Sequence, residues 1–220
     1  MNQHAKFLSS FGRNRGRALR PYQQGLVDNL LPKLAVNLAA PRENYRKLAL
    51  EIGFGGGEHL LAQAEHHPDT LFIGCEPFIN GVAKCLAGID RQNLANIRLF
   101  THDARELIAA LPEACLDAVF ILFPDPWPKA RHQKRRLVNA QTLSMLARVH
   151  KPGGRLLLAT DHVDYSVWML ETLLAHPDYI WTAQSRADWK NPPADWTQTK
   201  YQRKTSAEGR APLFFECVRR

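Results

Sequence analysis

Five carboxylates occur at or just after the ends of short apolar segments of the chain. They are Glu51, Glu76, Asp103, Asp125 and Asp161. Buried strands normally exclude Asp and Glu, so carboxylates that recur at these positions indicate a function rather than a packing requirement. If the segments are parallel strands, their carboxyl ends meet at one edge of the sheet, where such sheets bind ligands. The pattern therefore predicts one site that carries several carboxylates.

A glycine-rich turn, Gly53-Phe54-Gly55-Gly56-Gly57, follows the first of these segments. Gly53 and Gly55 would let the backbone approach a ligand closely, because glycine has no Cβ and accepts positive φ angles. The run departs from the G-x-G-x-x-G spacing of dinucleotide-binding proteins. Glu58, which opens the next predicted helix, would repel a pyrophosphate but not a ligand that carries an amino group and a sulfonium.

Three of the carboxylates suit the parts of a single nucleoside ligand. Glu76 lies 23 residues after Gly53, at the end of the next predicted strand, where it can accept hydrogen bonds from ribose hydroxyls. Asp103 can accept from the exocyclic amine of an adenine, and Glu51 can face the cationic end of the ligand. Together these residues describe S-adenosylmethionine better than NAD.

The apolar pattern predicts strands that alternate with helices from residue 47 onward. We expect strands at 48–52, 71–75, 97–100, 118–123 and 155–160, and two final strands at 179–182 and 213–218. We expect helices at 58–66, 77–88, 103–110 and 137–149, a turn at 151–154, and a further helix with an apolar face of Val163, Val167, Leu170 and Leu174. This alternation predicts an α/β fold with a parallel sheet and helices on both faces.

The net charge of +8 is concentrated in two short segments. Residues 1–20 and residues 129–136 each carry five Lys or Arg and no acid, so the rest of the chain is slightly negative. Such a distribution predicts a polyanionic partner, and nucleic acid fits better than a membrane because neither segment has an amphipathic apolar face. A solvated basic surface that aids solubility is the alternative.

Composition also bears on location and metal binding. The longest apolar run, residues 118–123, is far shorter than the about 20 residues of a membrane span. The first 20 residues lack the apolar core of a secretory signal. The four cysteines form no C-x-x-C pair, and no His lies at zinc-ligand spacing. We therefore expect a cytoplasmic protein without a metal site or a membrane association, and with no obligate protein partner implied.

Several motifs together resemble those of the bacterial tRNA (guanine-N7-)-methyltransferases. They are Glu51-Ile52-Gly53-Phe54-Gly55, Phe123-Pro124-Asp125-Pro126-Trp127 with Lys129, the run from Ala130 to Arg136, Thr160-Asp161, Thr199-Lys200-Tyr201, and Ser10-Phe11 before an arginine-rich arm. The glycine motif is generic to methyltransferases, whereas the F-P-D-P-W run with its basic continuation is specific. The resemblance covers nearly the whole chain.

The resemblance implies a class I methyltransferase (Rossmann-like) fold, with a seven-stranded, mostly parallel sheet whose last strand is antiparallel. It implies an S-adenosylmethionine-dependent methyltransferase domain over residues 47–220, whereas the charge and the apolar spacing of residues 1–46 predict a basic arm and a short helix that Pro32 interrupts or ends. The implied reaction transfers a methyl group from S-adenosylmethionine to N7 of guanine 46, in tRNA numbering, in the variable loop of tRNA. A non-catalytic RNA-binding protein that retains the fold is the alternative, which the intact set of carboxylates disfavours.

The resemblance also assigns roles to single residues. The cofactor ligands become Glu51, Glu76, Asp103 and Asp125, of which Asp125 is also catalytic. The substrate contacts become Lys129, Asp161, Thr199, Lys200 and Tyr201. The RNA-contacting segment becomes Arg131, His132, Gln133, Lys134, Arg135 and Arg136. Gln202 stands where the family usually has Glu, so a neutral amide replaces a carboxylate at a position expected to contact the substrate.

Asp125 and its neighbours suit this reaction. Guanine N7 has a free lone pair and no proton, so its methylation needs no base there, whereas a carboxylate at the Watson–Crick edge can accept from N1–H and N2–H and offset the growing positive charge. Pro124 and Pro126 fix two φ angles and so stiffen the loop that holds Asp125. Trp127 could stack on a splayed base or could be a core aromatic. The basic run 129–136 has no acid beside it in the sequence, which favours phosphate contacts.

Overall fold

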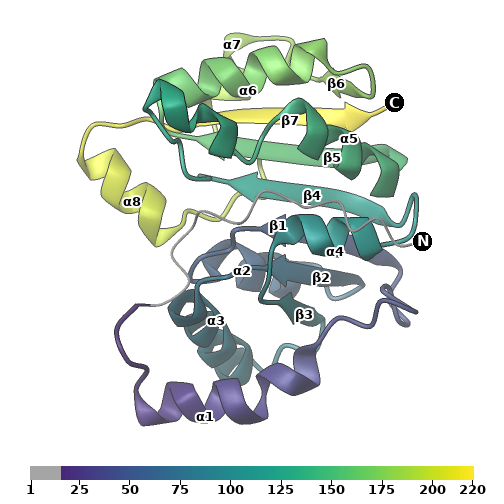
Figure 1. Cartoon of the computed structure of the whole chain (residues 1–220), viewed down its shortest axis with the longest axis vertical. Coiled ribbons are helices and arrows are strands. Elements are labelled where there is room, and N and C mark those ends of the chain that lie inside the picture. Colours follow the sequence, from purple (N-terminus) through teal and green to yellow (C-terminus); the bar gives the residue numbers. More distant parts are fainter. Residues whose placement is uncertain (1–15) are drawn as a thin grey trace.

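A computed structural model describes residues 16–220, so the N-terminal predictions on Ser10, Phe11 and the first three cations of the arm lie outside the described residues. The described chain folds around one seven-stranded sheet with the order β3-β2-β1-β4-β5-β7-β6 (Figure 1). The strands are β1 (Lys47–Ile52), β2 (Thr70–Cys75), β3 (Ile97–Phe100), β4 (Leu116–Leu122), β5 (His150–Thr160), β6 (Tyr179–Trp181) and β7 (Leu213–Arg219).

Strand direction agrees with the sequence prediction. β1 to β5 are mutually parallel, while β7 pairs antiparallel with both β5 and β6. The seven-stranded class I methyltransferase fold is therefore confirmed, and β7 is the antiparallel last strand. Because β1, β2, β4 and β5 are parallel neighbours, their carboxyl ends gather at one sheet edge.

Helices cover both faces of the sheet. They are α1 (Pro21–Asn29), α2 (Glu58–His66), α3 (Ile79–Gln92), α4 (Ala104–Ala110), α5 (Ala140–Val149), α6 (Val163–Ala175), α7 (Arg186–Lys190) and α8 (Lys200–Ala207), with short 3-10 turns η1 (Leu31–Leu34) and η2 (Ala130–Arg135). Pro32 lies in η1, so the chain makes a separate turn after α1. No helix within residues 16–220 is long and apolar enough to cross a membrane.

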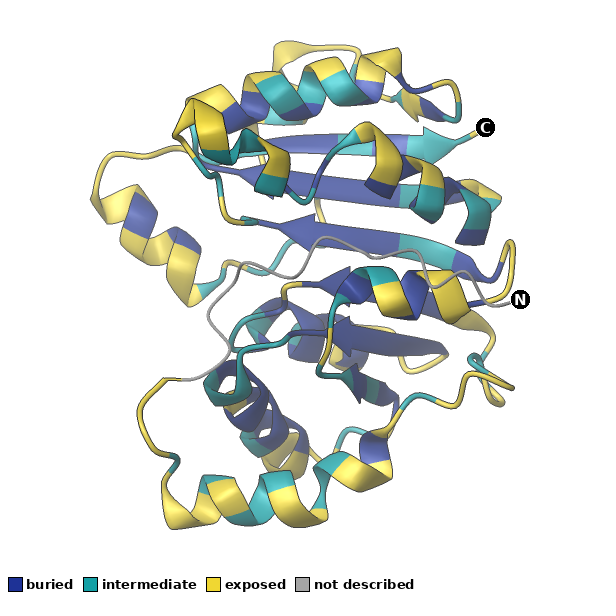
Figure 2. Cartoon of the chain, viewed as in Figure 1, coloured by how far each residue is buried: buried dark blue, intermediate teal, exposed yellow. Residues whose placement is uncertain are grey.

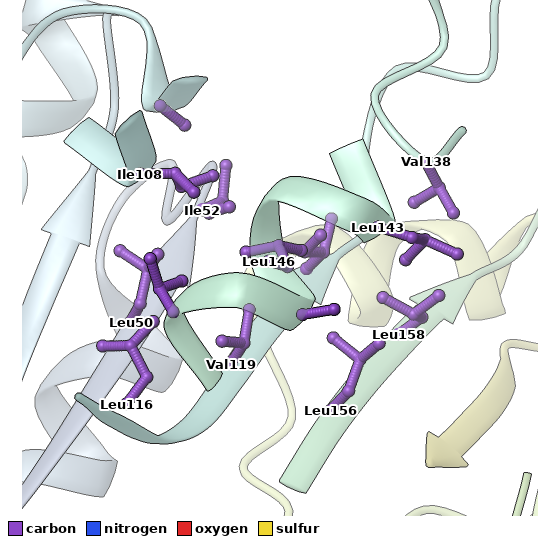
Figure 3. Packing of buried hydrophobic residues seen from close by; sticks show 14 of the residues in the cluster. Leu50, Ile52, Ile108, Leu116, Val119, Val138, Leu143, Leu146, Leu156 and Leu158 are labelled. Atoms are coloured by element: carbon purple, nitrogen blue, oxygen red, sulfur yellow. The ribbon is translucent and has the colours of Figure 1, made fainter. Parts of the chain in front are cut away.

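The alternation of side chains along β1 divides the core into two layers. Leu48 and Leu50 point into a layer built with α4, α5 and α6, whereas Ala49 points into a layer built with α2 and α3. Figure 3 shows Leu143 and Leu146 of α5 packed among residues of β1, β4 and β5. The strands are buried along most of their length, whereas α1 and α8 are largely exposed (Figure 2).

The apolar face predicted for α6 is wrong at three of its four residues, and only Leu170 packs against the core. Val163 and Val167 are exposed, as is Leu174, while Tyr165 and Met169 are completely buried. Tyr165 reaches the core with its ring, and its hydroxyl accepts a hydrogen bond from the Val138 amide at 3.1 Å. The prediction considered aliphatic residues only and left out Tyr165. The ring of Tyr165 packs in the core and its hydroxyl is hydrogen-bonded there, so the buried face of α6 is centred on this residue.

The predicted turn at 151–154 is a bulge inside a strand. β5 begins at His150, which pairs with Leu116, and the pairing resumes between Arg155 and Ala118. The four intervening residues of β5 face a single residue of β4, and Gly153 has φ +76°. The Pro-Gly-Gly sequence thus loops out of the ladder without ending the strand.

Candidate functional site

The glycine turn after β1 exposes backbone to an open space. Gly53 and Gly55 have φ of +78° and +54°, a region that glycine adopts at low cost. A Cβ built on either residue would meet no atom within 4 Å. A Cβ on Gly57, in contrast, would lie 2.7 Å from the Cys85 sulfur, so that glycine is needed for helix packing. The first two glycines therefore offer backbone to a ligand.

Glu76 at the end of β2 braces this turn. Its Oε2 accepts a hydrogen bond from the Gly55 amide and its Oε1 one from the Phe78 amide, both at 2.9 Å. Burial raises the pKa of this carboxyl, and the two backbone hydrogen bonds partly offset that rise. Each oxygen still has a second lone pair, so the carboxylate can accept further hydrogen bonds from a ligand.

Asp103 caps helix α4 and is paired with Arg105. Its Oδ1 accepts from the backbone amide and Nε of Arg105, both at 2.9 Å, and its Oδ2 lies 2.5 Å from the guanidinium. Burial acts to raise the pKa of Asp103, but these hydrogen bonds outweigh it and lower the pKa below the ordinary value. Asp103 is thus an ionised acceptor at the carboxyl edge of the sheet.

Asp125 is held in a loop with an unusual backbone. The loop is flanked by Phe123 and Trp127, whose φ angles are +53° and +42°. Positive φ is uncommon for bulky residues and costs free energy that the surrounding structure must supply. Asp125 lies between these two residues, just after β4, and its side chain is exposed.

One cavity of about 510 Å³ brings most of these groups together. Its walls include Gly53, Glu76, Asp103 and Asp125, and the basic side chains Lys134 and Arg135. Trp127 also lines it, with the Arg135 guanidinium 5.1 Å from the Trp127 ring centre. Four of the six predicted cofactor residues and part of the predicted RNA segment therefore share a single hollow.

Glu51 does not line this cavity. It is buried, and its Oε2 lies 2.8 Å from Nδ1 of His59 on α2. Side chains alternate along β1, so Glu51 points toward α2 rather than straight off the end of the strand. Its sequence-based role at the cationic end of a ligand stays a prediction, and His59 is a partner that the sequence pattern did not indicate.

Arg136, the last residue of the predicted RNA-contacting segment, lines the cavity but is almost fully enclosed by protein groups, and its contact with RNA stays a prediction. This side chain is buried, forms an ion pair with Asp164, and donates from Nε to the Pro126 carbonyl at 3.0 Å. Its guanidinium also lies 5.0 Å from the ring centres of both Tyr165 and Trp168. The sequence argument noted no acid beside the basic run, but Asp164 is supplied by α6, 28 residues further along the chain.

A second cluster forms around Asp161 at the end of β5. The Arg210 guanidinium lies 2.7 Å from Asp161 Oδ2, and the Tyr201 hydroxyl donates to Oδ1 at 3.3 Å. Phe123 links this cluster to the cavity, because it lines the cavity and its ring lies 5.2 Å from that of Tyr201. Arg210 was not predicted, and no motif in the sequence singled it out.

Helix α8 presents the remaining predicted substrate residues. Thr199 caps the helix, with its Oγ1 accepting from the Gln202 amide at 3.1 Å. Gln202 is buried and its Oε1 accepts from Trp196 Nε1 at 2.8 Å, so it faces the protein interior. Lys200 on α8 and Lys129 before η2 are exposed. Gln202 therefore anchors the helix, and its role as a substrate contact stays a prediction.

Comparison with known proteins identifies the family. A family model described as a putative methyltransferase matches residues 45–214. A tRNA (guanine-N(7)-)-methyltransferase of Rhodopseudomonas palustris (strain BisA53) is 46% identical over 96% of this chain and 88% of its own length. One of Caulobacter sp. (strain K31) is 47% identical over 96% of this chain and 95% of its own length. The chain belongs to the tRNA (guanine-N(7)-)-methyltransferase family.

Solved structures support the fold. The 16S rRNA methyltransferase KamB aligns with a TM-score of 0.56 at 15% identity, covering 81% of this chain and 91% of that one. The 16S rRNA (adenine(1408)-N(1))-methyltransferase of Catenulisporales acidiphilia aligns with a TM-score of 0.55 at 20% identity, covering 83% and 91%. At these identities the likeness concerns the fold of the enzyme alone.

The cofactor of this methyltransferase family is S-adenosylmethionine, and the cavity fits it. Gly53 and Gly55 leave open space where any other residue would place a Cβ, as a ligand lying against the backbone requires. Glu76 and Asp103 supply acceptors at the ends of neighbouring strands, where ribose hydroxyls and an adenine amine need them. The groups predicted to bind the methyl donor thus lie together at the carboxyl edge of the sheet.

Proposed function

We propose that this enzyme acts in the cytoplasm and transfers a methyl group from S-adenosylmethionine to N7 of guanine 46 in the variable loop of tRNA. The observation that carries the proposal is the shared cavity, in which Asp125 lies with Glu76 and with the cations Lys134 and Arg135. A small neutral substrate would not need the cations, and a binding module would not need the carboxylates. The relatives' names supply the substrate class.

We assign the cofactor to the glycine turn and the two neighbouring strand ends. Glu76 accepts from the ribose hydroxyls with the lone pairs that Gly55 and Phe78 leave free, and Asp103 accepts from the adenine amine. Bound there, S-adenosylmethionine supplies the methyl group. Residues 47–220 then form the methyltransferase domain, and residues 1–46 form the arm with its short helix, which packs on α3 through partly buried apolar residues.

Asp125 orients the guanine in this proposal. Its carboxylate accepts from N1–H and N2–H, which leaves the lone pair of N7 directed toward the donor and needs no proton transfer at N7. As the ring becomes cationic, N1–H becomes more acidic and the carboxylate stabilises the charge more strongly than in the ground state. The rigid backbone between Phe123 and Trp127 means that little reorganisation is required.

The remaining contacts divide between η2 and α8. On η2 and just before it, the exposed cations Lys129, Arg131 and Lys134 can contact phosphates, as can Arg135 at the cavity wall. His132 and Gln133 of the same turn are half-buried and complete the proposed RNA-contacting segment. On α8, Lys200 and Tyr201 extend the substrate surface from Thr199 toward Asp161. The two elements lie on either side of the Asp125 loop through Phe123 and Trp127.

The decisive experiment combines the purified protein, methyl-labelled S-adenosylmethionine and an unmodified tRNA transcript that has guanine at position 46. Nuclease digestion should yield labelled 7-methylguanosine, and a transcript with adenine at position 46 should remain unlabelled. A different labelled nucleoside, or equal labelling of both transcripts, would overturn the proposal. Tight tRNA binding without transfer would support a non-catalytic RNA-binding protein instead.

A further inference from the structure

A second hollow, of about 300 Å³, lies between four helices on the flank of the molecule. Helices α1, α2, α3 and α8 all contribute to its walls. Its floor is made of small residues, Gly56, Ala87 and Gly88, and its rim carries the cations Lys84, Arg91 and Lys200. We call this hollow the α3–α8 groove.

The cations of the groove are available to a ligand. Lys84 and Arg91 are exposed, and neither side chain forms a hydrogen bond or an ion pair with another residue of the described chain. They lie seven residues apart on α3, and therefore on one face of the helix and about 10 Å apart along its axis. Asp90, the nearest acid in the sequence, accepts from the Tyr22 hydroxyl at 2.7 Å instead.

Among the described residues, a single carboxylate lines the α3–α8 groove. It belongs to Glu58, which lies 3.9 Å from Lys200 Nζ, and the Lys200 side chain is 79% exposed. The three cations thus outnumber the acid, and Gln23 on α1 adds a neutral amide to the rim. Such a lining favours an anion that is extended along α3, because the small floor residues leave room between the two cations of that helix.

The groove is continuous with the proposed substrate surface. Lys200 precedes Tyr201, whose hydroxyl contacts Asp161, and Gly56 belongs to the glycine turn beside the main cavity. At the amino end of α3, the Asn80 side chain accepts from the Gly16 amide at 2.8 Å and donates to the Arg17 carbonyl at 2.7 Å. The described end of the basic arm is therefore fastened to the same helix that carries Lys84 and Arg91.

We propose that the α3–α8 groove binds the sugar-phosphate backbone of tRNA next to the target guanine. This proposal rests on the proposed function for its ligand, since a base held near Asp125 and Asp161 brings its flanking phosphates toward α8. Cations form most of the polar lining of the groove, and Lys84 and Arg91 are exposed, so its main contribution is to affinity and placement rather than to sequence recognition.

The test removes the cations of Lys84 and Arg91 and compares the tRNA binding of this variant with that of a matched control variant. The variant is Lys84→Ala with Arg91→Ala, and the control is Arg46→Ala with Lys47→Ala. The control residues are also exposed, but they lie at the start of β1, at the opposite sheet edge. The dissociation constant of a tRNA transcript is measured over a series of salt concentrations, with melting temperature and S-adenosylmethionine affinity as checks on folding.

We expect the groove variant to flatten the slope of log K against log salt by about 0.7–0.9 for each phosphate that it no longer neutralises, and the control to keep the wild-type slope. The KM for tRNA should rise in the groove variant. Equal slopes for the two double variants would overturn the proposal, even if wild-type protein methylates guanine 46. If wild-type protein binds tRNA without transferring a methyl group, the proposed function fails. In that case, a salt slope that is shallower in the groove variant but not in the control would still support tRNA binding in the groove.

Discussion

The Arg210 guanidinium lies 2.7 Å from the carboxylate of Asp161 and holds the carboxyl end of β5 to the segment that follows α8. The Asp161 side chain is only 4% exposed, while that of Arg210 is 42% exposed. The two residues are 49 positions apart in the sequence. Because Tyr201 bonds to the same carboxylate, α8 reaches the sheet edge through the residue proposed to contact the substrate.

Replacing Arg210 with Ala should slow methyl transfer at least about tenfold, because a small misplacement of Tyr201 and Asp161 lowers the rate steeply. S-adenosylmethionine affinity should stay close to wild type, since the cluster lies outside the cofactor cavity. Trypsin should cleave α8 faster in the variant. Arg210→Lys should restore part of the rate. Arg203→Ala is the control, because within residues 16–220 the hydrogen bond of the Arg203 side chain goes to the Gln198 carbonyl beside its own helix. An unchanged rate and cleavage pattern in Arg210→Ala would show that Arg210 positions nothing.

Asp125→Asn should separate binding from chemistry. The amide keeps the shape of the side chain but loses the charge that complements the cationic product ring. Loss of one such interaction typically lowers the rate by about 10²–10³. Single-turnover transfer measurements should show this loss with tRNA affinity near wild type, because phosphates carry most of that affinity. Near-normal transfer would make Asp125 a structural residue.

The basic run should divide into two functions. Lys134→Ala with Arg135→Ala should flatten the salt dependence of tRNA binding by about 0.7–0.9 for each phosphate left without its cation. Arg136→Ala should instead destabilise the fold, by about 1–3 kcal/mol for the unpaired Pro126 carbonyl alone. Denaturant unfolding and salt-dependent binding measured on both variants check this. A stable Arg136→Ala protein with a flattened slope would reverse the assignment.

Glu76→Ala should weaken S-adenosylmethionine binding about tenfold to a hundredfold, since an unpaired buried group costs about 1–3 kcal/mol and each 1.4 kcal/mol is a factor of ten. Because burial raises the pKa of Glu76, wild-type affinity should also fall as the pH drops through a value above that of an ordinary Glu. A protonated carboxyl can no longer accept from Gly55, Phe78 and the ribose together. Calorimetry at several pH values should find this dependence in wild type and not in the variant.

His150 should make the fold sensitive to acid. Burial lowers its pKa to about 4, whereas the unfolded chain protonates near 6.5. Below pH 6.5 the unfolded state therefore binds a proton that the native state does not, and stability falls by up to about 3 kcal/mol as the pH drops toward 4. Unfolding of His150→Gln across this range should show a smaller loss than wild type. His66→Gln, at the exposed end of α2, should behave as wild type.

Local signals in the sequence were sufficient for most elements. α2 begins after the last glycine of the turn and ends before Pro68. β3 is a short segment in which Arg98 is the one polar residue, and both elements have the predicted bounds. The strand–helix alternation also located the carboxylates at strand ends, because strand direction follows from the connections. These features depend on residues that are close together in the sequence, so a local sequence pattern is enough to predict them.

Tertiary structure alone decided which side chains meet. Arg136 lies in the basic run, yet it is buried and paired with Asp164 of α6, whereas Lys134 in the same run is exposed. Gln202 lies within a predicted substrate motif, yet its side chain is buried and accepts a hydrogen bond from Trp196. Asp161 forms an ion pair with Arg210, which is 49 residues away in the sequence. The sequence alone determined the alternation of strands and helices, the family motifs and the carboxylate edge. Partners distant in sequence depend on how helices pack, and a buried charge or amide goes where such a partner compensates its desolvation.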